Sequence, residues 1–520
     1  MPSPHIMACT LPPVALPAGA VLLDDGAWIV VNKPADVSVD GSSAGDDLVG
    51  RLKRVLSARD SVPPSSVYLR AHQHLERDTS GIVALARCPE ANCALAAAAA
   101  QHRGQVTVLL GGEAGPRLRA EGAFDAHVRR QPDGSVCTRR SKQGSWTERV
   151  HGTYRVTERR DTRALVEVVS QQTSVRNLRA VLVSEGLLVP AGDAAHGGEP
   201  APRLLVHVLR ARMDHPLRAV TVEVATPAPW VFPAWLHDEL CVDKLPEHVV
   251  PTAIADALIR RDVLLRRGDL DAVRLVHGEA EGLWGLDIEA YGPYLVVWLG
   301  EQVPEAVRER VLDSAHALGA RGVYSKIRPK QASRMVDART KQLTAPHAAR
   351  GQDAEQTLHV QEGPLRFAVR MGEGLSTGLF LDQRRTRAWV RDHAKDMRVL
   401  NLFAHTCSFT VAAAAAGARC TVSVDASARL LEQGRANLER NGLMDARQEL
   451  VCADVLAWLR DAAGAGREFD LIILDPPSYS TTRQSRFSAA RDYVALAASC
   501  MDRIGAGGGT LLACTNHRGV

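Results

Sequence analysis

The sequence predicts a multidomain protein in which an α+β domain and a small β-rich domain precede a doubly wound α/β domain. Three observations support this fold class. The chain has 520 residues, more than one hydrophobic core usually holds. Residues 21–232 consist mainly of short β-type runs separated by Gly, Asp and Pro, which favours an α+β fold. From residue 358 onward, strand-like and helix-like segments alternate, as in a parallel sheet covered by helices.

The domain boundaries follow changes in composition. Residues 1–20 are interrupted by prolines and lack a basic region, so we expect a disordered leader and no signal peptide. The first domain is predicted at 21–235 and ends in the Pro-rich VATPAPWVFPAWL. Residues 240–357 are predicted to hold a linker helix and the small β-rich domain. The α/β domain is predicted at 358–520.

Within the middle region, residues 250–270 have apolar residues at three- and four-residue spacing, which predicts a helix. The run DAVRLVHGEAEGLWGLDIEAYGPYLVVWLG predicts two or three strands with a Gly-containing turn. A helix (PEAVRERVLDSAHALG) and a strand (GVYSKIR) follow. Residues 336–357 are polar and without periodicity, so we expect a loop.

Four features mark the carboxyl ends of successive strands in the α/β domain, where a doubly wound fold binds its ligand. They are the small-residue loop 401–409 (NLFAHTCSF), Asp425, Asp454, and the run Asp475-Pro-Pro-Ser-Tyr479. A carboxylate at such a position can hold ribose hydroxyls or an amino group. The alternative for any single Asp is a helix N-cap, but the four features in order favour a ligand site.

The bulk composition excludes some classes and permits others. The net charge of +4 permits nucleic-acid binding without arguing for it. The ten cysteines include no C-x-x-C pair, so we expect no metal site and a reducing, cytoplasmic location. No apolar run approaches the roughly 18 residues of a transmembrane helix, so no membrane partner is expected.

The carboxyl-terminal third resembles the S-adenosylmethionine (SAM)-dependent methyltransferases that modify large-subunit ribosomal RNA. The matching segments are GLSTGLFLDQR, VLNLFAHTCSFTVAAAAAGA, FDLIILDPPSYS and TLLACTNHRG. The run RLVHGEAEGLWGLD is similar to the small domain of the cytosine-5 branch. The resemblance implies a class I, Rossmann-like methyltransferase with SAM as cofactor. It implies that SAM is bound by Phe380, Asp382, Arg384, Asn401, Phe403, Thr406, Cys407, Ser408, Phe409, Asp425 and Asp454.

Two branches of that family differ in chemistry. Cytosine C5 is a poor nucleophile, so the cytosine-5 branch attacks C6 with a cysteine. Here Asn516 occupies the nucleophile position and Cys514 lies two residues earlier, within the expected strand. The ending Asn-His-Arg-Gly instead resembles the guanine-N7 branch, in which a ring nitrogen needs only orientation and charge stabilisation. The expected catalytic residues are Asp475, Pro476, Pro477, Tyr479 and Asn516, with Asp475 on the base edge and Tyr479 stacked on a flipped base.

Two departures from the family pattern bear on this domain. Cys407 stands where the family has Gly, and its Cβ is expected to crowd the cofactor. The sequence also stops just after the strand that contains Cys514, where such folds continue with a helix and a hairpin. We expect either that these elements are lost or that the sequence is a fragment.

The amino-terminal domain resembles the RluA-type pseudouridine synthases. IVVNKPADV, HQHLERDTSG, SQQTSVRNLRAVLVSEGLLVPAGDAAHGG and LLVHVLRARMDHPL match in order. The resemblance places Glu76 at the catalytic aspartate, followed by the retained Arg77, and Val106 at the active-site tyrosine. Ser174 replaces an arginine, and Arg179 is retained. Because a misplacement of about 1 Å can cost roughly a hundredfold in rate, we expect an inactive site whose fold binds RNA.

The favoured hypothesis is a SAM-dependent 23S rRNA methyltransferase acting on a base nitrogen, with guanine N7 preferred and the amino-terminal domain docking RNA. Three alternatives remain: a cytosine-5 rRNA methyltransferase, a bifunctional pseudouridine synthase and methyltransferase in which Glu76 is competent, and an inactive RNA-binding ribosome-assembly factor.

Overall fold

The computed structural model forms two compact units. The amino-terminal unit comprises Pro12–Arg266 and Val276–Gly285, and the carboxyl-terminal unit comprises Arg267–Leu275 and Leu286–Val520. The residues that the structure describes are 15–42, 46–72, 75–101, 104–132, 135–139, 148–171, 174–328, 343–461, 466–481 and 485–515.

The amino-terminal unit is built on a twelve-stranded sheet with the order β1-β2-β4-β11-β5-β9-β8-β6-β7, on which β3, β10 and β12 pair at the side. Neighbouring strands are antiparallel except β4 and β11, which are parallel. The strands are β1 (Val21–Asp24), β2 (Trp28–Lys33), β3 (Arg70–Ala71), β4 (Ser80–Ala86), β5 (Gln105–Ala114), β6 (Glu121–Arg130), β7 (Val136–Arg139), β8 (Glu148–Arg160), β9 (Arg163–Ser170), β10 (Leu188–Pro190), β11 (Val206–Asp214) and β12 (Thr221–Ala225).

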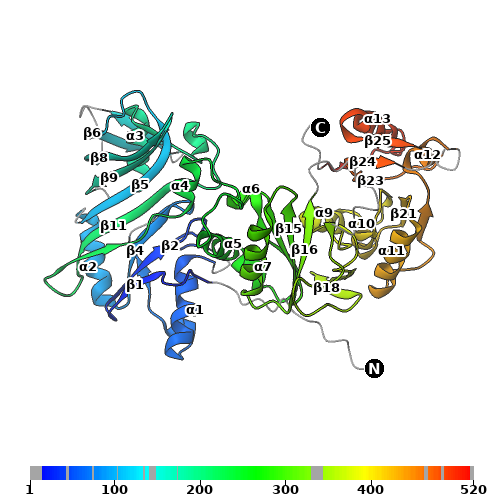
Figure 1. Cartoon of the computed structure of the whole chain (residues 1–520), viewed down its shortest axis with the longest axis horizontal. Coiled ribbons are helices and arrows are strands. Elements are labelled where there is room, and N and C mark those ends of the chain that lie inside the picture. Colours follow the sequence, from blue (N-terminus) through cyan, green and yellow to red (C-terminus); the bar gives the residue numbers. More distant parts are fainter. Residues whose placement is uncertain are drawn as a thin grey trace. The chain divides into compact units, whose positions relative to one another are not determined.

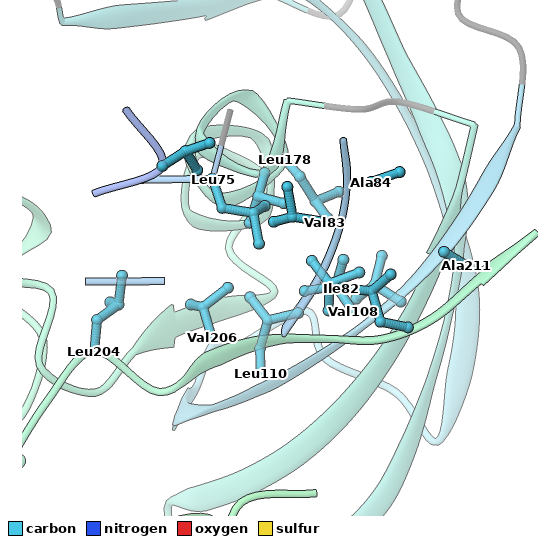
Figure 2. Close-up of a cluster of buried hydrophobic side chains, with 14 of the residues drawn as sticks. Leu75, Ile82, Val83, Ala84, Val108, Leu110, Leu178, Leu204, Val206 and Ala211 are labelled. Carbon is cyan, nitrogen blue, oxygen red and sulfur yellow. The ribbon is translucent and has the colours of Figure 1, made fainter. Parts of the chain in front are cut away.

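Helices flank this sheet, and its central strands are largely buried. All seven residues of β4 are buried, and Figure 2 shows Val83, Val108 and Val206 gathered with Leu178 of the helix beside them. Such continuous apolar strands are typical of a sheet that is covered by other elements. The helices are α1 (Leu48–Asp60), α2 (Pro89–Ala100), α3 (Val175–Ser184), α4 (Val231–Leu236), α5 (Val249–Leu265) and α6 (Gly278–Glu281), with 3-10 turns η1 (Pro64–Ser66) and η2 (Ala194–His196).

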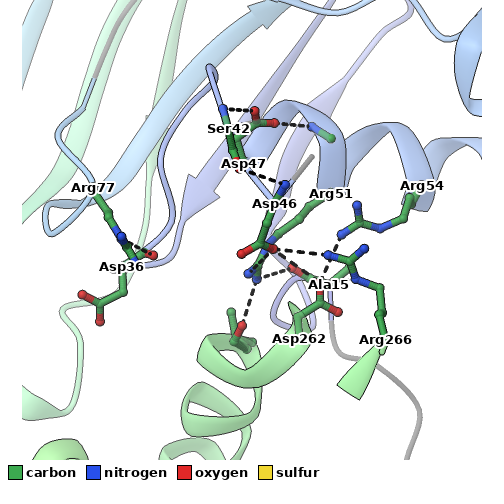
Figure 3. Close-up of polar contacts among 12 residues, drawn as sticks. Ala15, Asp36, Ser42, Asp46, Asp47, Arg51, Arg54, Arg77, Asp262 and Arg266 are labelled. Carbon is green, nitrogen blue, oxygen red and sulfur yellow. Dashed lines mark hydrogen bonds and ion pairs between the residues drawn. The ribbon is translucent and has the colours of Figure 1, made fainter. Parts of the chain in front are cut away.

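Buried ion pairs join α1 to α5 (Figure 3). Arg51, only 1% exposed, lies 2.7 Å from the Asp46 carboxylate and donates 3.0 Å to the carbonyl of Ile259. Fully buried Asp262 accepts from Arg54 at 3.1 Å and from Arg266 at 2.9 Å. The sequence assigned the helix over 250–270 to the middle region, but these contacts and the burial of Ile259 in the core place α5 in the amino-terminal unit.

The carboxyl-terminal unit begins with a small five-stranded sheet in the order β13-β14-β15-β16-β17. Its strands are β13 (Ala272–His277), β14 (Leu286–Tyr291), β15 (Tyr294–Gly300), β16 (Gly322–Arg328) and β17 (Arg350–Gly351). Helix α7 (Glu305–His316) connects β15 to β16, which pair in parallel. A β-rich sheet with one helical crossover therefore lies where the sequence predicts the small β-rich domain.

The strand–helix alternation starts later than the sequence indicated. Residues from 358 form a two-stranded antiparallel hairpin, β18 (Leu358–Glu362) and β19 (Leu365–Val369). The hairpin is a separate sheet because its apolar side packs onto the helices of the α/β layer, for example Phe367 in the same core cluster as Val411. The alternation begins only at residue 398.

The α/β layer is a parallel five-stranded sheet with the order β22-β21-β20-β23-β26. This order reverses beside the first strand, as doubly wound folds do at their ligand site. The strands are β20 (Arg398–Leu402), β21 (Cys420–Asp425), β22 (Gln448–Cys452), β23 (Leu471–Leu474) and β26 (Thr510–Ala513), and a short hairpin pairs β24 (Tyr479–Thr481) with β25 (Arg486–Ser488).

Helices cover both faces of this sheet (Figure 1). In β23, Leu471 and Ile473 pack into one core cluster, while Ile472 and Leu474 pack into another, because successive strand residues point to opposite faces. The first cluster includes residues of α9 (Arg384–His393), α10 (Ser408–Ala415) and α11 (Ala428–Arg440). The second includes α12 (Val455–Arg460) and α13 (Ala489–Met501). The predicted doubly wound class is thus observed.

The leader prediction falls mostly outside the described residues, which begin at 15. From there the chain makes defined contacts: the Ala15 carbonyl accepts from Arg51 at 3.2 Å, and the Ala20 carbonyl accepts from the Asn32 backbone N–H at 2.7 Å. Residues 15–20 are therefore part of the amino-terminal unit. Within the described part of the chain, every helix is too short or too polar to cross a membrane.

Candidate functional site

A cavity of about 380 Å³ lies at the carboxyl ends of β20, β21 and β23 in the carboxyl-terminal unit. This volume lies within the usual range for small-molecule sites. Its lining combines carboxylates with aromatic and aliphatic side chains. The lining residues are Phe380, Asp382, Gln383, Arg387, Phe403, Ala404, His405, Ser408, Phe409, Asp425, Ala426, Leu430, Asp454, Val455, Leu456, Asp475, Pro476, Pro477, Ser480, Ser485, Phe487 and Thr515.

The loop between β20 and α10 has an unusual backbone. Phe403, His405 and Cys407 all have positive φ, at 58°, 50° and 58°, a region that non-glycine residues rarely adopt. The loop is held from several sides: the Thr406 hydroxyl donates to the Gly378 carbonyl at 2.6 Å, and the Asn437 amide donates to the Thr406 carbonyl at 3.0 Å. These contacts hold the turn in its strained conformation. The turn brings the backbone of 403–405 to the cavity.

Asp425 fixes this loop and also lines the cavity. Its Oδ2 accepts from the His405 N–H at 2.8 Å, and its Oδ1 accepts from the Ser427 N–H at 2.9 Å. An ionised carboxylate has about four acceptor positions, so each oxygen can accept a further hydrogen bond from a ligand. The geometry fits a pair of neighbouring hydroxyls, as in a ribose.

Asp454 combines the two interpretations that the sequence left open. It is the N-cap of α12, where its Oδ1 accepts from the Ala457 N–H at 2.9 Å. Its Oδ2 accepts from the Ser485 hydroxyl at 2.5 Å. It nevertheless lines the cavity beside Val455, so it joins an apolar wall that suits a planar ring.

The carboxyl group of Asp475 has a raised pKa. Burial, with the neighbouring charge of Asp382 as a smaller cause, raises its pKa to about 6. The charge of Arg387 partly offsets both effects. Desolvation beside a like charge is typical of functional carboxyls, and Pro476 and Pro477 contribute no backbone N–H to neutralise it.

Of the residues predicted to bind the cofactor, Phe380, Asp382, Phe403, Ser408, Phe409, Asp425 and Asp454 line the cavity, and so do Asp475, Pro476 and Pro477. Phe380 is 47% exposed and its ring centroid lies 5.1 Å from that of His405. Tyr479, 46% exposed, lies in β24 and is not a lining residue. Asn516 lies outside the described residues.

Four predicted cofactor residues do not line the cavity. Asn401 is buried and donates to the Thr410 hydroxyl at 2.9 Å. Thr406 is turned toward Gly378, and Arg384 lies outside the lining. Asn401 and Thr406 therefore support the helix α10 and the loop from inside the protein instead of facing the cavity.

Cys407 corrects a further expectation. Its side chain is fully buried and packs in a small cluster with Ala404 and Leu431, away from the cavity lining. A Cβ built on Gly434 of α11 would lie 2.8 Å from the Cys407 Cβ and closer still to its Sγ. The cysteine therefore occupies space left by a helical glycine and does not crowd the cavity.

This pairing predicts a strongly non-additive double substitution. Gly434→Ala alone should destabilise the domain by about 1–3 kcal/mol through overpacking, despite the better helix propensity of alanine. Cys407→Gly removes the side chain that the new Cβ would meet. Gly434→Ala introduced into that background should therefore stabilise by about 1 kcal/mol, because alanine has the better helix propensity. Calorimetric unfolding of the four proteins measures the coupling, and additive effects would contradict the contact.

Arg387 was missed by the sequence reasoning. It is 1% exposed, and its guanidinium forms two hydrogen bonds with Glu362, at 2.8 and 2.6 Å, and one with the Phe380 carbonyl, at 2.8 Å. It therefore fixes the segment that carries Phe380 at the cavity. The sequence signal for this ion pair was the amphipathic pattern of residues 384–393. Arg387 lies on the buried side of that helix, where an arginine needs a buried partner.

Cys514 directly follows β26, just beyond the strand in which the sequence placed it. Burial raises the pKa of its thiol to about 11, and the charge of Asp475 adds to the rise. Its Sγ lies 4.0 Å from Gln383 Oε1, and it is absent from the cavity lining. A thiol that stays protonated is a weak nucleophile.

The predicted degenerate site of the amino-terminal unit is assembled around Glu76. Its Oε2 lies 2.6 Å from Arg179, and its Oε1 lies 3.3 Å from Arg176. Arg179 also contacts Asp193 at 3.1 Å. The structure thus brings Glu76 and Arg179 together, as the predicted site requires.

The other predicted residues of that site have structural contacts. Arg77 donates from its Nε to the Asp36 carbonyl at 3.1 Å. Ser174 is the N-cap of α3 and accepts from the Asn177 N–H. Val106 lies in β5 opposite Ser170 and provides no hydroxyl. In the described part of the chain, no group of three or more His, Cys, Asp and Glu side chains could hold a metal ion.

Comparison with known proteins matches residues 327–520 to the family of S-adenosylmethionine-dependent methyltransferases. The chain is 39% identical over 219 residues to a "Ribosomal RNA large subunit methyltransferase K/L" of Ectopseudomonas mendocina (strain ymp), covering 41% of this chain and 29% of the relative. It is 31% identical over 238 residues to a "Ribosomal RNA large subunit methyltransferase I" of Enterobacter sp. (strain 638), covering 45% and 58%.

Among solved structures, the chain is similar to "Human RNA Pseudouridylate Synthase Domain Containing 4" at 18% identity and a TM-score of 0.34, covering 43% of this chain and 93% of that one. The chain spans less than two thirds of the length of the curated relatives it matches first.

Proposed function

We propose that this chain, whose residues 327–520 form a SAM-dependent methyltransferase domain, methylates a base of large-subunit ribosomal RNA, and that the acceptor is guanine N7. The observation that carries the proposal is the cavity at the strand ends, where Asp425, Asp454 and Asp475 converge. The similarity to large-subunit rRNA methyltransferases supports the substrate class.

The lining fits SAM by its donor and acceptor set. Asp425 would take the two ribose hydroxyls with the acceptor positions left by its backbone hydrogen bonds. Asp454 would accept from the adenine amino group, with Val455 and Leu430 against the ring. When bound, SAM supplies an electrophilic methyl group on a sulfonium.

The residues around Asp475 in the cavity suit a purine base. The Watson–Crick edge of guanine carries two adjacent donors, N1–H and the N2 amino group, which match the two oxygens of the Asp475 carboxylate. Exposed Phe380 and Tyr479 offer aromatic faces near the same cavity, on which a flipped base can stack. Holding the Watson–Crick edge leaves N7 on the opposite edge unhindered.

The chemistry of the acceptor favours a ring nitrogen over C5 of cytosine. N7 carries a lone pair and needs orientation rather than covalent activation. The described thiol nearest the strand end, Cys514, has a raised pKa and lies outside the cavity lining. This site therefore lacks, among the described residues, the thiolate that cytosine-5 chemistry requires.

The proposal is tested with purified protein, radiolabelled SAM, and large-subunit rRNA or subunits from a strain lacking the gene. We expect label in one guanosine, at a position that becomes sensitive to the borohydride and aniline cleavage that is diagnostic of N7-methylguanosine. Label in a cytidine would overturn guanine N7 in favour of cytosine C5. Absence of SAM binding by folded protein would overturn the methyltransferase function itself.

A pH profile tests the role of Asp475. A carboxylate is needed to accept from the base, and the pKa of Asp475 is raised to about 6, so kcat/KM should fall as pH drops through 6. Asp475→Asn should be slower above pH 7 and should lose this inflection. Because the folded pKa exceeds the unfolded one, Asp475 destabilises the fold at neutral pH, and the Asn variant should be slightly more stable there. An unchanged inflection in Asp475→Asn would contradict the assignment.

We also propose that the amino-terminal unit binds RNA without forming pseudouridine. Glu76 is already engaged by Arg179 and Arg176, and Val106 supplies no hydroxyl group. With rRNA that carries tritium at C5 of uridine, tritium release should therefore stay at background for both the wild type and Glu76→Ala. Release that depends on Glu76 would establish the bifunctional alternative.

A further inference from the structure

A second and larger cavity, of about 670 Å³, lies within the amino-terminal unit. Its walls come from the end of β2, from residues 202–203, from the Pro-rich run 227–230, and from α5. Helix α5 follows the segment that resembles a pseudouridine synthase, so part of this cavity is built by sequence outside that resemblance. Glu76 and Arg179 do not line it.

Three basic side chains line the cavity. Lys33 is fully buried, and its ammonium donates to the carbonyls of Pro34, Val37 and Arg77. Arg203 lies 5.6 Å from the ring of Phe232. Arg260 is 3.0 Å from Asp36. Burial lowers the pKa of Lys33 to about 7, and the charge of Arg203 adds to the lowering.

Arg203 differs from the other two in its hydrogen bonding. Its Nη2 is buried and has no hydrogen-bond partner among the described residues. Burial and the charge of Arg260 lower its pKa to about 10. An unpaired guanidinium nitrogen inside a cavity is costly in isolation, and its fork geometry matches phosphate and carboxylate oxygens.

Another part of the lining suits a planar ring. Trp230 lines the cavity, and its Nε1 donates to Asp256 Oδ2 at 3.0 Å. This bond fixes both side chains and leaves acceptor positions on Asp256. Most of the remaining wall is apolar and comes from proline, alanine and valine residues. Desolvation raises the pKa of Asp256, so its carboxyl is suited to hydrogen-bonding a ligand in a dry environment.

We propose that this cavity binds a phosphorylated small molecule with a planar ring, of the nucleoside monophosphate class. Arg203 takes the phosphate, with Lys33 contributing charge. Trp230 and the proline-rich wall hold the ring, and Asp256 accepts from a ring or sugar donor. Phosphate is favoured over a single carboxylate because two cationic groups lie beside one another at that end of the cavity.

Calorimetric titration of the full chain tests the proposal, with uridine 5′-monophosphate and adenosine 5′-monophosphate as probes. Uridine and adenosine are the matched ligands without phosphate, and benzoate represents a ring with a carboxylate. We expect at least one monophosphate to bind at least about tenfold more tightly than its nucleoside. Arg203→Gln should abolish that difference. Arg159→Gln, an exposed arginine of β8 outside the lining, should preserve it.

A steric variant guards against misfolding of Arg203→Gln. Thr252 is exposed on α5 and lines the cavity, so Thr252→Trp should block binding while leaving thermal unfolding unchanged. SAM titration of the same samples reports separately on the carboxyl-terminal unit. Equal binding of nucleotide and nucleoside, or no binding of either monophosphate below about 1 mM, would overturn the proposal. Tighter binding of benzoate would replace phosphate by carboxylate and overturn the nucleotide class.

Discussion

Replacing Asp425 by alanine is expected to weaken SAM binding at least a hundredfold. The substitution removes the acceptors proposed for the ribose hydroxyls. It also removes the acceptors of the His405 and Ser427 N–H groups, which hold a loop with three residues at positive φ. Losing two or three hydrogen bonds to a charged group costs about 3 kcal/mol or more, which corresponds to about a hundredfold in affinity.

Isothermal titration of the full chain with SAM measures this effect. Asp445→Ala is the matched control, because Asp445 is a carboxylate of the same unit whose side chain pairs with Arg447 at the surface. We expect that control to bind SAM as wild type does. Calorimetric unfolding establishes that Asp425→Ala is folded. Retention of near-normal affinity by the folded variant would remove Asp425 from the site.

The largest effect on stability is expected from Glu362→Ala. Glu362 and Arg387 form a buried ion pair with two hydrogen bonds, at 2.8 and 2.6 Å. Their side chains are 8% and 1% exposed. Removing the carboxylate leaves the Arg387 charge buried with only the Phe380 carbonyl as an acceptor, which should cost about 3–5 kcal/mol. For a domain of this size the midpoint of the corresponding thermal transition should fall by about 10 °C.

Glu373→Ala is the matched control for burial. Glu373 also accepts from two arginines, Arg370 at 3.1 Å and Arg429 at 3.0 Å, but its side chain is 40% exposed. Exposed pairs contribute about 0–1 kcal/mol, so scanning calorimetry should show little change. Comparable losses of stability in the two variants would mean that burial does not determine how much the Glu362 ion pair contributes to stability. Because Arg387 fixes the Phe380 segment, Glu362→Ala should also weaken SAM binding, and Glu373→Ala should not.

The strand-end carboxylates were predictable from local patterns. An apolar strand followed by Asp places the carboxylate at the edge of the sheet whatever the loops do, because strand alternation and parallel pairing are set by the apolar pattern. Asp425, Asp454 and Asp475 accordingly line one cavity. Asp454 also shows that the capping and lining roles are compatible, since one carboxylate oxygen caps α12 and the side chain still lines the wall.

The direction of side chains in the loop 403–409 was not predictable. Phe403, His405 and Cys407 have positive φ. This backbone changes the direction of successive side chains, and the residue types alone do not predict it. Thr406 and Cys407 consequently point into the protein, while His405 lines the cavity. The space behind Cys407 depends on Gly434, a residue of another helix.

By itself, the sequence determined the doubly wound class of the α/β layer, the order of its elements from β20 onward, and the carboxylates at its strand ends. These features follow from apolar periodicity and strand termini, which are local properties of the chain. Only the tertiary structure decided that α5 packs in the amino-terminal unit, that Arg387 pairs with Glu362, and that Arg203 lines a cavity with its Nη2 unpaired within the described ranges. The reason is that burial and pairing of a charge depend on residues distant in sequence, whose distances are set only when the chain packs.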